Sequence, residues 1–175
     1  MGLFLMETKW KGNNRTKQAW EERLAQLETD LDSVQSDLIE VQIAQNLEQA
    51  YVIVETDNIK QATKVVEKMN LQVELQKEVR LIGESLEDVK RQSGLVNYLV
   101  EWNLPEHLTM EAYLERKEKN SVKYEEVPEV SFARTYVCED ITKWLCLYDA
   151  PNQEAVEKAQ KVVEAPIDAI TRLDE

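Results

Sequence analysis

Hydrophobic positions along the chain follow two different periods. In some stretches they recur at every second residue, which is typical of strands with one buried face, and in others at every third or fourth residue, which is typical of amphipathic helices. Residues 3–9 read as a strand, and Thr16 offers a cap for a helix that ends at Asp32 and Ser33. A turn at 46–49 joins two further strands. The strands and helices predicted for the first half cover 3–9 (strand), 16–33 (helix), 38–45 and 51–54 (strands), a helix capped by Thr56 or Asp57 and running to Met69, and 71–79 (strand).

The second half shows the same order of patterns, β-α-β-β-α-β. A charged stretch at 119–128 is predicted to be a flexible loop, and Pro166 separates the last helix from the last strand. Residues 83–94 are polar apart from Leu86 and Val89 and form a predicted connector with one helical turn that starts at Ser85. The predicted elements of this half are strand 95–102, helix 109–117, strands 129–138 and 143–148, helix 152–163 and strand 167–173.

Short sequences recur between the two halves. Phe-Leu-Met-Glu at 4–7 is echoed by Tyr-Leu-Val-Glu at 98–101, and Lys-Val-Val-Glu at 64–67 returns unchanged at 161–164. Each echo falls at the matching place in its half, which predicts a tandem duplication. The predicted domain organisation is repeat 1 at 1–83, a connector at 84–94 and repeat 2 at 95–175.

The predicted fold class is α+β. Each half reads as a ferredoxin-like βαββαβ unit with both helices on one face of its sheet. Because an apolar sheet face cannot stay in water, the two bare faces are expected to cover each other within one chain. The sequence therefore predicts an intramolecular pseudo-dimer like a dimeric α/β barrel, with a pocket between the two sheets.

A coiled coil is the competing interpretation of residues 20–38. The spacing there alternates between four and three residues, as in a coiled-coil seam. The pattern lasts fewer than three heptads and is interrupted at Asp32 and Ser33, so the amphipathic helix is favoured. The residues in question are Trp20, Leu24, Leu27, Leu31, Val34 and Leu38.

Composition and charge narrow the class of protein. The chain has 175 residues, of which 43% are hydrophobic and 31% charged, so a folded globular protein is expected. Its net charge of −13 argues against nucleic acids and anionic membranes as partners. Without a long apolar run, a cytoplasmic location is predicted, and Cys138 and Cys146 are expected to be free thiols.

Several residues are candidates for binding a ligand. Glu7 and Glu101 occupy the same slot of the repeated opening strand between apolar neighbours, so they are candidates if they face the space between the sheets and edge charges if they do not. Arg134 and Tyr136 share one face of their strand, together with Val130, Phe132 and Cys138, and the arginine either reaches the sheet rim or pairs with a buried acid such as Glu101. The tryptophans, Trp102 among them, are expected in the core, with pocket lining as the alternative.

The familiar catalytic motifs are missing from the sequence. It contains no glycine-rich phosphate loop, no Cys-x-x-Cys, no nucleophile elbow and no His-Glu-x-x-His. His107 is the single histidine, so any triad or metal site based on histidine depends on it. It follows Pro105 at the start of a helix pattern, where a solvated surface histidine is expected.

The second half resembles a known family. The stretches 98–101, 134–137, 145–156 and 165–170 are similar to small bacterial ferredoxin-like proteins described as nickel-binding or nickel-responsive. Members are mostly single βαββαβ units that dimerise, which agrees with the predicted fold. The resemblance implies a divalent metal, nickel, as a cofactor, for which the candidate ligands are Glu101, His107 and Cys138. Where members commonly carry Arg, Trp and His, this chain has Trp102, Phe132 and Arg134.

Three functions remain open at this stage. The favoured one is a non-enzymatic, cytoplasmic binding or regulatory protein that holds a small ligand or metal ion between its sheets. The second is a cofactor-independent enzyme of the dimeric α/β barrel type, with Glu101 or His107 as general base and Arg134 stabilising an anionic intermediate. The third is a protein–protein interaction module that docks a partner on its open helical face or on its acidic loop, where the acidic residues are densest at Glu125, Glu126 and Glu129.

Overall fold

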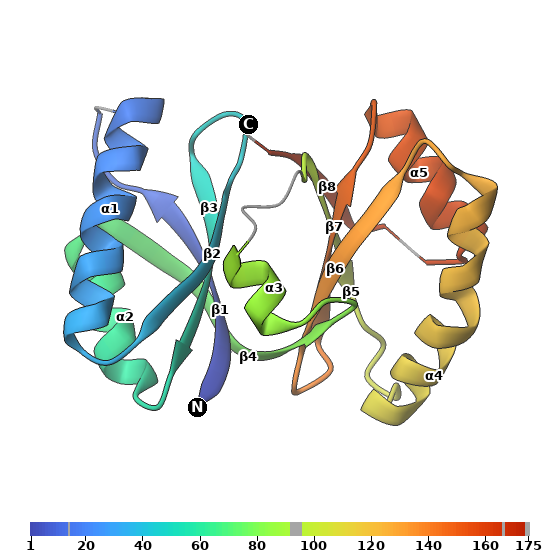
Figure 1. The fold of residues 1–175 in the computed structure, drawn as a ribbon, viewed down its shortest axis with the longest axis horizontal. Helices are drawn as coiled ribbons and strands as arrows, with labels where there is room; N and C mark the ends of the chain where they lie inside the picture. Colours follow the sequence, from blue (N-terminus) through green and yellow to red (C-terminus); the bar gives the residue numbers. More distant parts are fainter. Residues whose placement is uncertain (14, 92–95, 166, 174–175) are drawn as a thin grey trace. The chain divides into compact units, whose positions relative to one another are not determined.

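The chain folds into two compact units. The computed structural model describes residues 1–13, 15–91, 96–165 and 167–173. The first unit comprises Met1–Val79 and a short segment that begins at Val89, and the second comprises Arg80–Asp88 and the chain from Val96 to Leu173. In each unit the longer helices lie on one face of an antiparallel sheet (Figure 1).

The first unit has the β-α-β-β-α-β order that the sequence predicts. Its strands pair in the order β2-β3-β1-β4, and every described pair is antiparallel. Its core lies between this sheet and the two helices. The elements are β1 (Gly2–Trp10), α1 (Lys17–Ser33), β2 (Asp37–Ile43), β3 (Gln49–Thr56), α2 (Ile59–Lys68) and β4 (Leu71–Ile82).

The second unit repeats this topology. Its strands follow the order β6-β7-β5-β8, which matches β2-β3-β1-β4 element by element. The last residues of β4, from Arg80, belong to this unit, where β4 neighbours β6. Its elements are β5 (Tyr98–Asn103), α4 (Met110–Ser121), the 3₁₀ helix η1 (Val122–Glu126), β6 (Ser131–Cys138), β7 (Lys143–Asp149), α5 (Gln153–Val162) and β8 (Ala169–Arg172). The short helix α3 (Leu86–Arg91) begins in this unit, and its residues from Val89 belong to the first unit.

Helix α1 begins and ends where the sequence predicts. The Thr16 hydroxyl accepts a hydrogen bond from the Ala19 backbone N–H at 3.0 Å, which satisfies one of the free donors of the first turn. Trp20, Leu27 and Leu31 are fully buried in the core of the first unit. This segment is therefore an amphipathic helix packed on a sheet rather than one helix of a coiled coil.

The predicted cap of helix α2 is wrong by one or two residues. Asn58 is the N-cap, and its side-chain oxygen accepts a hydrogen bond from the Gln61 backbone N–H at 3.1 Å. Thr56 cannot take this role because its hydroxyl is buried, where it accepts hydrogen bonds from the Ser36 hydroxyl and the Asn58 backbone N–H. The hydroxyl thus anchors the loop before the helix instead.

The charged stretch at 119–128 is not the loop that the sequence predicts. Helix α4 continues to Ser121, and η1 follows it directly. The ring of Tyr124 stacks on Phe132 with centroids 5.5 Å apart, and Val127 is fully buried. These two side chains pack the segment against the rest of the second unit, although its many charged residues suggested a solvent-exposed loop.

Two β-bulges at matching places change which face the following residues occupy. The register of β2 shifts between Leu38 and Glu40, and that of β6 shifts between Phe132 and Arg134. Leu38 and Phe132 pack against the helix-side cores, whereas Glu40 and Arg134, two residues further along, lie on the opposite face because each shift inserts one residue. The prediction that Arg134 shares a face with Phe132 and Val130 is therefore wrong.

The α+β fold class is confirmed, with two ferredoxin-like units in one chain. As predicted, Cys138 and Cys146 form no disulfide, and the structure shows that both are buried. Within the described residues, no helix is long and apolar enough to cross a membrane.

Candidate functional site

The sheet of the second unit separates two chemically different faces. Along β5, Tyr98, Val100 and Trp102 belong to the core under helices α4 and α5. Because side chains alternate along a strand, Leu99 and Glu101 project from the other face, which carries neither of these helices. We call this second surface the helix-free face of the second unit.

Glu101 forms an ion pair on the helix-free face. Its Oε1 atom lies 2.5 Å from Nζ of Lys143 on the neighbouring strand β7. The two side chains are only 14% and 16% exposed, so both charges are largely withdrawn from water. A carboxylate and an ammonium group held in this way attract each other more strongly than they would at an open surface.

Tyr136 lies in the same row of this face as Glu101. Leu145 is the register partner of Glu101 on one side and of Tyr136 on the other. Strands in a sheet are about 4.8 Å apart, so the two Cα atoms are separated by roughly 10 Å. Tyr136 is 2% exposed and Leu145 also 2%, which gives the Glu101–Lys143 pair an apolar flank.

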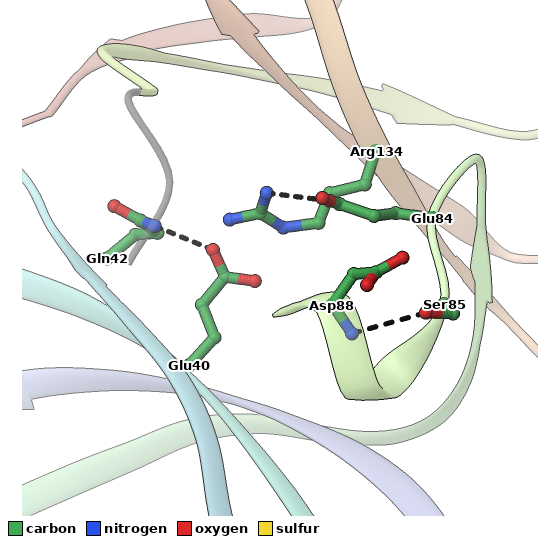
Figure 2. A network of polar contacts seen from close by, with 6 residues as sticks. All are labelled: Glu40, Gln42, Glu84, Ser85, Asp88 and Arg134. Carbon is green, nitrogen blue, oxygen red and sulfur yellow. Dashed lines mark hydrogen bonds and ion pairs between the residues drawn. The ribbon is translucent and has the colours of Figure 1, made fainter. Parts of the chain in front are cut away.

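Arg134 is buried and is paired with an acid, but not with the predicted one. Its Nη1 atom lies 3.1 Å from Oε2 of Glu84, with side-chain exposures of 3% for the arginine and 22% for the glutamate (Figure 2). Glu101 is not a described partner because it is engaged by Lys143. A buried guanidinium requires a counter-charge, and the loop before α3 supplies it.

The loop before α3 is held by a helix cap. The Ser85 hydroxyl accepts a hydrogen bond from the Asp88 backbone N–H at 3.2 Å, so the helical turn predicted to begin at Ser85 is present (Figure 2). Glu84 comes immediately before this cap, and the capped turn therefore fixes the carboxylate that pairs with Arg134.

The first unit does not repeat this arrangement. Glu7 lies on the helix-free face of its own sheet, opposite Tyr51 and Leu75. Glu40, which follows the bulge of β2, occupies the position that Arg134 holds in the second unit. It is 9% exposed and accepts a hydrogen bond from Gln42 Nε2 at 2.6 Å (Figure 2). The equivalent sites thus carry opposite charges.

The other predicted site residues lie apart from this group. Trp102 is on the helix side of β5, where it packs edge-on against Trp144 with centroids 5.4 Å apart. His107 is exposed in the turn between β5 and α4. Cys138 ends strand β6 and is 1% exposed.

The residues named as metal ligands do not form a described metal site. Among the residues that the structure describes, no group of three or more His, Cys, Asp or Glu side chains could hold a metal ion. Ni(II) favours imidazole and thiolate ligands. Since His107 lies in an exposed turn and Glu101 pairs with Lys143, these side chains do not fit a nickel centre within this chain.

Sequence reasoning missed both partners of the charged pairs. Lys143 stood in the strand pattern without a role, and Glu84 lay in the predicted connector. The alternation of β7 could have placed Lys143 on the same face as Leu145, but no sequence signal connects Glu84 with Arg134, because 50 residues separate them.

Comparisons with known proteins agree with the fold. Residues 98–173 match the family model described as nickel responsive protein SCO4226-like. A solved structure of a putative chlorite dismutase matches with a TM-score of 0.63 at 9% identity, over 100% of this chain and 96% of the other. A putative monooxygenase from Lactobacillus acidophilus matches with a TM-score of 0.52 at 12% identity, over 99% and 94%. A comparison with curated proteins found no similar sequence.

These findings support part of the predicted resemblance. The nickel-responsive family is matched in the second half only, and the whole-chain matches show the dimeric α/β barrel type of fold, which confirms the predicted pseudo-dimer class. Descent of the first half by duplication stays a prediction.

The predicted function requires a correction. The sequence favoured a non-enzymatic binding protein over an enzyme, but the solved structures that share the fold over the whole chain are titled as a chlorite dismutase and a monooxygenase. The comparisons therefore favour the enzyme alternative, and the prediction of a non-enzymatic protein is wrong.

Proposed function

We propose that the chain is an enzyme that removes a proton from a weakly acidic carbon of a small organic substrate, with Glu101 as the general base. The observation that carries this proposal is the Glu101–Lys143 ion pair, which is closed to 2.5 Å, largely buried and next to apolar side chains on the helix-free face. Two solved structures of the same fold, named as a putative chlorite dismutase and a putative monooxygenase, support the choice of class.

Glu101 suits the role of base better than His107. A base must reach the substrate in a fixed orientation and away from bulk water. The Glu101 carboxylate is held by Lys143, whereas His107 lies in an exposed turn.

Lys143 takes the role that the sequence gave to Arg134. When the carboxylate accepts the proton, it loses its charge and no longer neutralises the ammonium group of Lys143. The electron pair of the broken C–H bond stays on the substrate as an enolate, whose oxygen the ammonium then attracts. This interaction exists only after proton transfer begins, so it stabilises the transition state rather than the bound substrate. Arg134 is 2% exposed and already paired with Glu84, which suits a structural role.

An enolate is also the form of a carbon acid that reacts most readily with dioxygen. This chemistry agrees with a fold shared with a putative monooxygenase. The proposal itself extends to the proton transfer, which can be measured without dioxygen.

The test is exchange of carbon-bound hydrogen in D₂O, followed by proton NMR, with 2-tetralone as the probe. We expect the protein to accelerate loss of the C1 proton signal over buffer, and Glu101→Gln to lower this acceleration by about 10²–10⁴-fold, the usual contribution of a general base. Lys143→Met should lower it by roughly 10²-fold because the anion loses its counter-charge.

The matched control is Glu129→Gln. Glu129 is 40% exposed and lies 3.9 Å from Lys158, so the same chemical change at this position should leave the exchange rate unchanged. His107→Gln should also leave it unchanged. Equal rates for the unmodified chain and Glu101→Gln would overturn the assignment of the base.

A further inference from the structure

A small pocket lies on the other side of the same sheet, between helix α4 and strands β5 and β7. The space open to the centre of a water molecule is about 40 Å³. About 10–15 Å³ of such space holds one water, so this pocket can hold a small molecule of several heavy atoms. Its lining includes Trp102, Tyr113, Lys117, Asn120, Trp144 and Cys146, all of them within the second unit.

Two buried hydrogen-bond donors of the lining have no partner among the described residues. The Tyr113 hydroxyl and the Trp144 Nε1–H group belong to side chains that are each 3% exposed, and neither atom makes a hydrogen bond. Buried polar groups in folded proteins are nearly always paired, so two such donors in one pocket indicate a missing acceptor. An indole N–H can only donate a hydrogen bond, so its missing partner must be an atom that accepts one.

The hydroxyl groups of the neighbouring Tyr124 and Tyr148 have hydrogen-bond partners within the protein. Tyr124 and Tyr148 share a hydrogen bond between their hydroxyl groups, and Gln160 Nε2 donates to the Tyr148 hydroxyl. Gln160 Oε1 in the same layer is a buried acceptor without a described partner, but only Tyr113 and Trp144 carry unpaired donors that line the pocket. Burial raises the pKa of Tyr113, so its hydroxyl keeps its proton and remains a donor.

The charge of the lining is positive. Lys117 places its Nζ atom 4.4 Å from the centroid of the Phe132 ring and 3.9 Å from Sγ of Cys146. The Arg116 guanidinium lies 5.4 Å from the ring centroid of Trp102. The described lining contains both cations and no carboxylate side chain. Apart from the amide of Asn120 and the thiol of Cys146, the rest of the lining is aromatic or aliphatic and includes Val163 and Ala165.

We propose that this pocket is a binding site for a small organic monocarboxylate. Its carboxylate oxygens would accept hydrogen bonds from the Tyr113 hydroxyl and Trp144 Nε1, with Lys117 as the counter-charge and the apolar chain against Trp102 and Val163. The site lies on the opposite face of the sheet from Glu101, so it is independent of the proposed proton transfer.

The test is an NMR titration of the whole chain labelled with ¹⁵N, with butyrate as the probe and 1-butanol and butylammonium as neutral and cationic molecules of the same size. The indole N–H signal of Trp144, assigned by its loss in Trp144→Phe, should shift saturably with butyrate. The signal of Trp20 should not move, because its Nε1 already donates to the Leu47 carbonyl at 2.7 Å in the other unit.

Matched variants separate the site from a general effect on folding. Tyr113→Phe removes one donor and keeps the ring, and should weaken butyrate binding about tenfold or more, since hydrogen bonds to charged groups are among the stronger ones. Tyr98→Phe is the control, because it removes a buried hydroxyl that bonds to Arg172 outside the pocket.

Three results would overturn the proposal. These are no shift of the Trp144 signal with butyrate, equal shifts with all three molecules, and equal affinity of Tyr113→Phe and Tyr98→Phe for butyrate. The first would show that the pocket holds water only, and the second that it selects size rather than charge. Because the readout is binding, these failures are distinct from a failure of Glu101→Gln to affect exchange.

Discussion

Single buried charges in the second unit are paired across short distances with partners on other segments. Arg134 is paired with Glu84 and Glu101 with Lys143, at 3.1 Å and 2.5 Å. An ion that has left water needs such a partner, and breaking the pair is costly because the remaining charge stays buried. The two pairs nevertheless differ in accessibility, since the guanidinium of Arg134 is far more enclosed than the Glu101 carboxylate.

The first prediction at this scale concerns Glu84→Gln. The change removes the negative charge next to Arg134 and should lower the free energy of unfolding by about 2 kcal/mol, since a buried guanidinium loses its counter-charge. Chemical denaturation followed by circular dichroism measures this loss. The exchange activity proposed for Glu101 should remain.

The control for this change is Glu139→Gln. Glu139 pairs with Arg80 at 2.9 Å, but the two side chains are 36% and 46% exposed, so the loss should stay below about 1 kcal/mol. A double variant, Glu84→Leu with Arg134→Met, should recover part of the stability lost in Glu84→Gln, because no buried charge remains. Equal losses at Glu84 and Glu139 would show that Arg134 does not depend on this carboxylate.

Secondary structure elements were the part of the molecule that the sequence predicted best. Amphipathic spacing and capping residues are local signals, and they located α1, with its cap at Thr16, and the β-α-β-β-α-β order of both units, but not η1. The predictions that were wrong concerned features that depend on other parts of the chain. The bulge between Phe132 and Arg134 inserts one residue into β6 and reverses the face of everything after it, and a period of two cannot show such an insertion.

The candidate site was predictable only in part for the same reason. Glu101 and Arg134 stood out as charges among apolar neighbours, which is visible in the sequence itself. Their partners depend on which strands become neighbours and on a loop 50 residues away from Arg134. The pocket under α4 was not predicted, because the segment that carries Tyr124 looked like a charged loop.

The helical layer of the second unit leads to a prediction about pH. Burial is the main cause that raises the pKa of Tyr113 on α4, of Tyr124 on η1 and of Tyr148 on β7. In the unfolded chain these groups ionise near pH 10. The contribution to stability is therefore fully present below about pH 10 and is lost as the pH rises above it, because ionisation then favours the unfolded chain.

We expect the free energy of unfolding to fall above about pH 10 by up to about 1.4 kcal/mol per pH unit for each of these tyrosines. The measurement is denaturant unfolding at several alkaline pH values, with the absorbance of tyrosinate recorded in parallel. Tyr148→Phe should make the decline less steep. If these tyrosines ionised near pH 10 while the chain stayed folded, their burial would be contradicted.

At the scale of the whole molecule, two units with one topology have cores of different composition. The core of the first is built around Trp20 and a long α1, and that of the second around the aromatic side chains of Tyr113, Trp144 and Tyr148. The similarity of the units therefore lies in strand order and in the matching bulges of β2 and β6, not in the residues that fill the two cores. This explains how one family model can match 98–173 alone.

Separate cores allow a prediction about stability in each unit. Leu31 is fully buried in the core of the first unit, and Leu31→Ala should lower the stability of that unit by about 2–5 kcal/mol through lost contacts and the cavity that remains. Native-state hydrogen exchange measures this for each unit separately. Amide protons of β3 should exchange faster, and those of β7 should be much less affected, because the side chain of Leu31 contributes to the first core only.

Ala25→Gly is a suitable comparison, since it changes the exposed face of the same helix and should cost only about 1 kcal/mol. If Leu31→Ala accelerated exchange equally in β3 and β7, the two cores would unfold as one cooperative structure, and the division of the chain into two units would describe its architecture but not its stability.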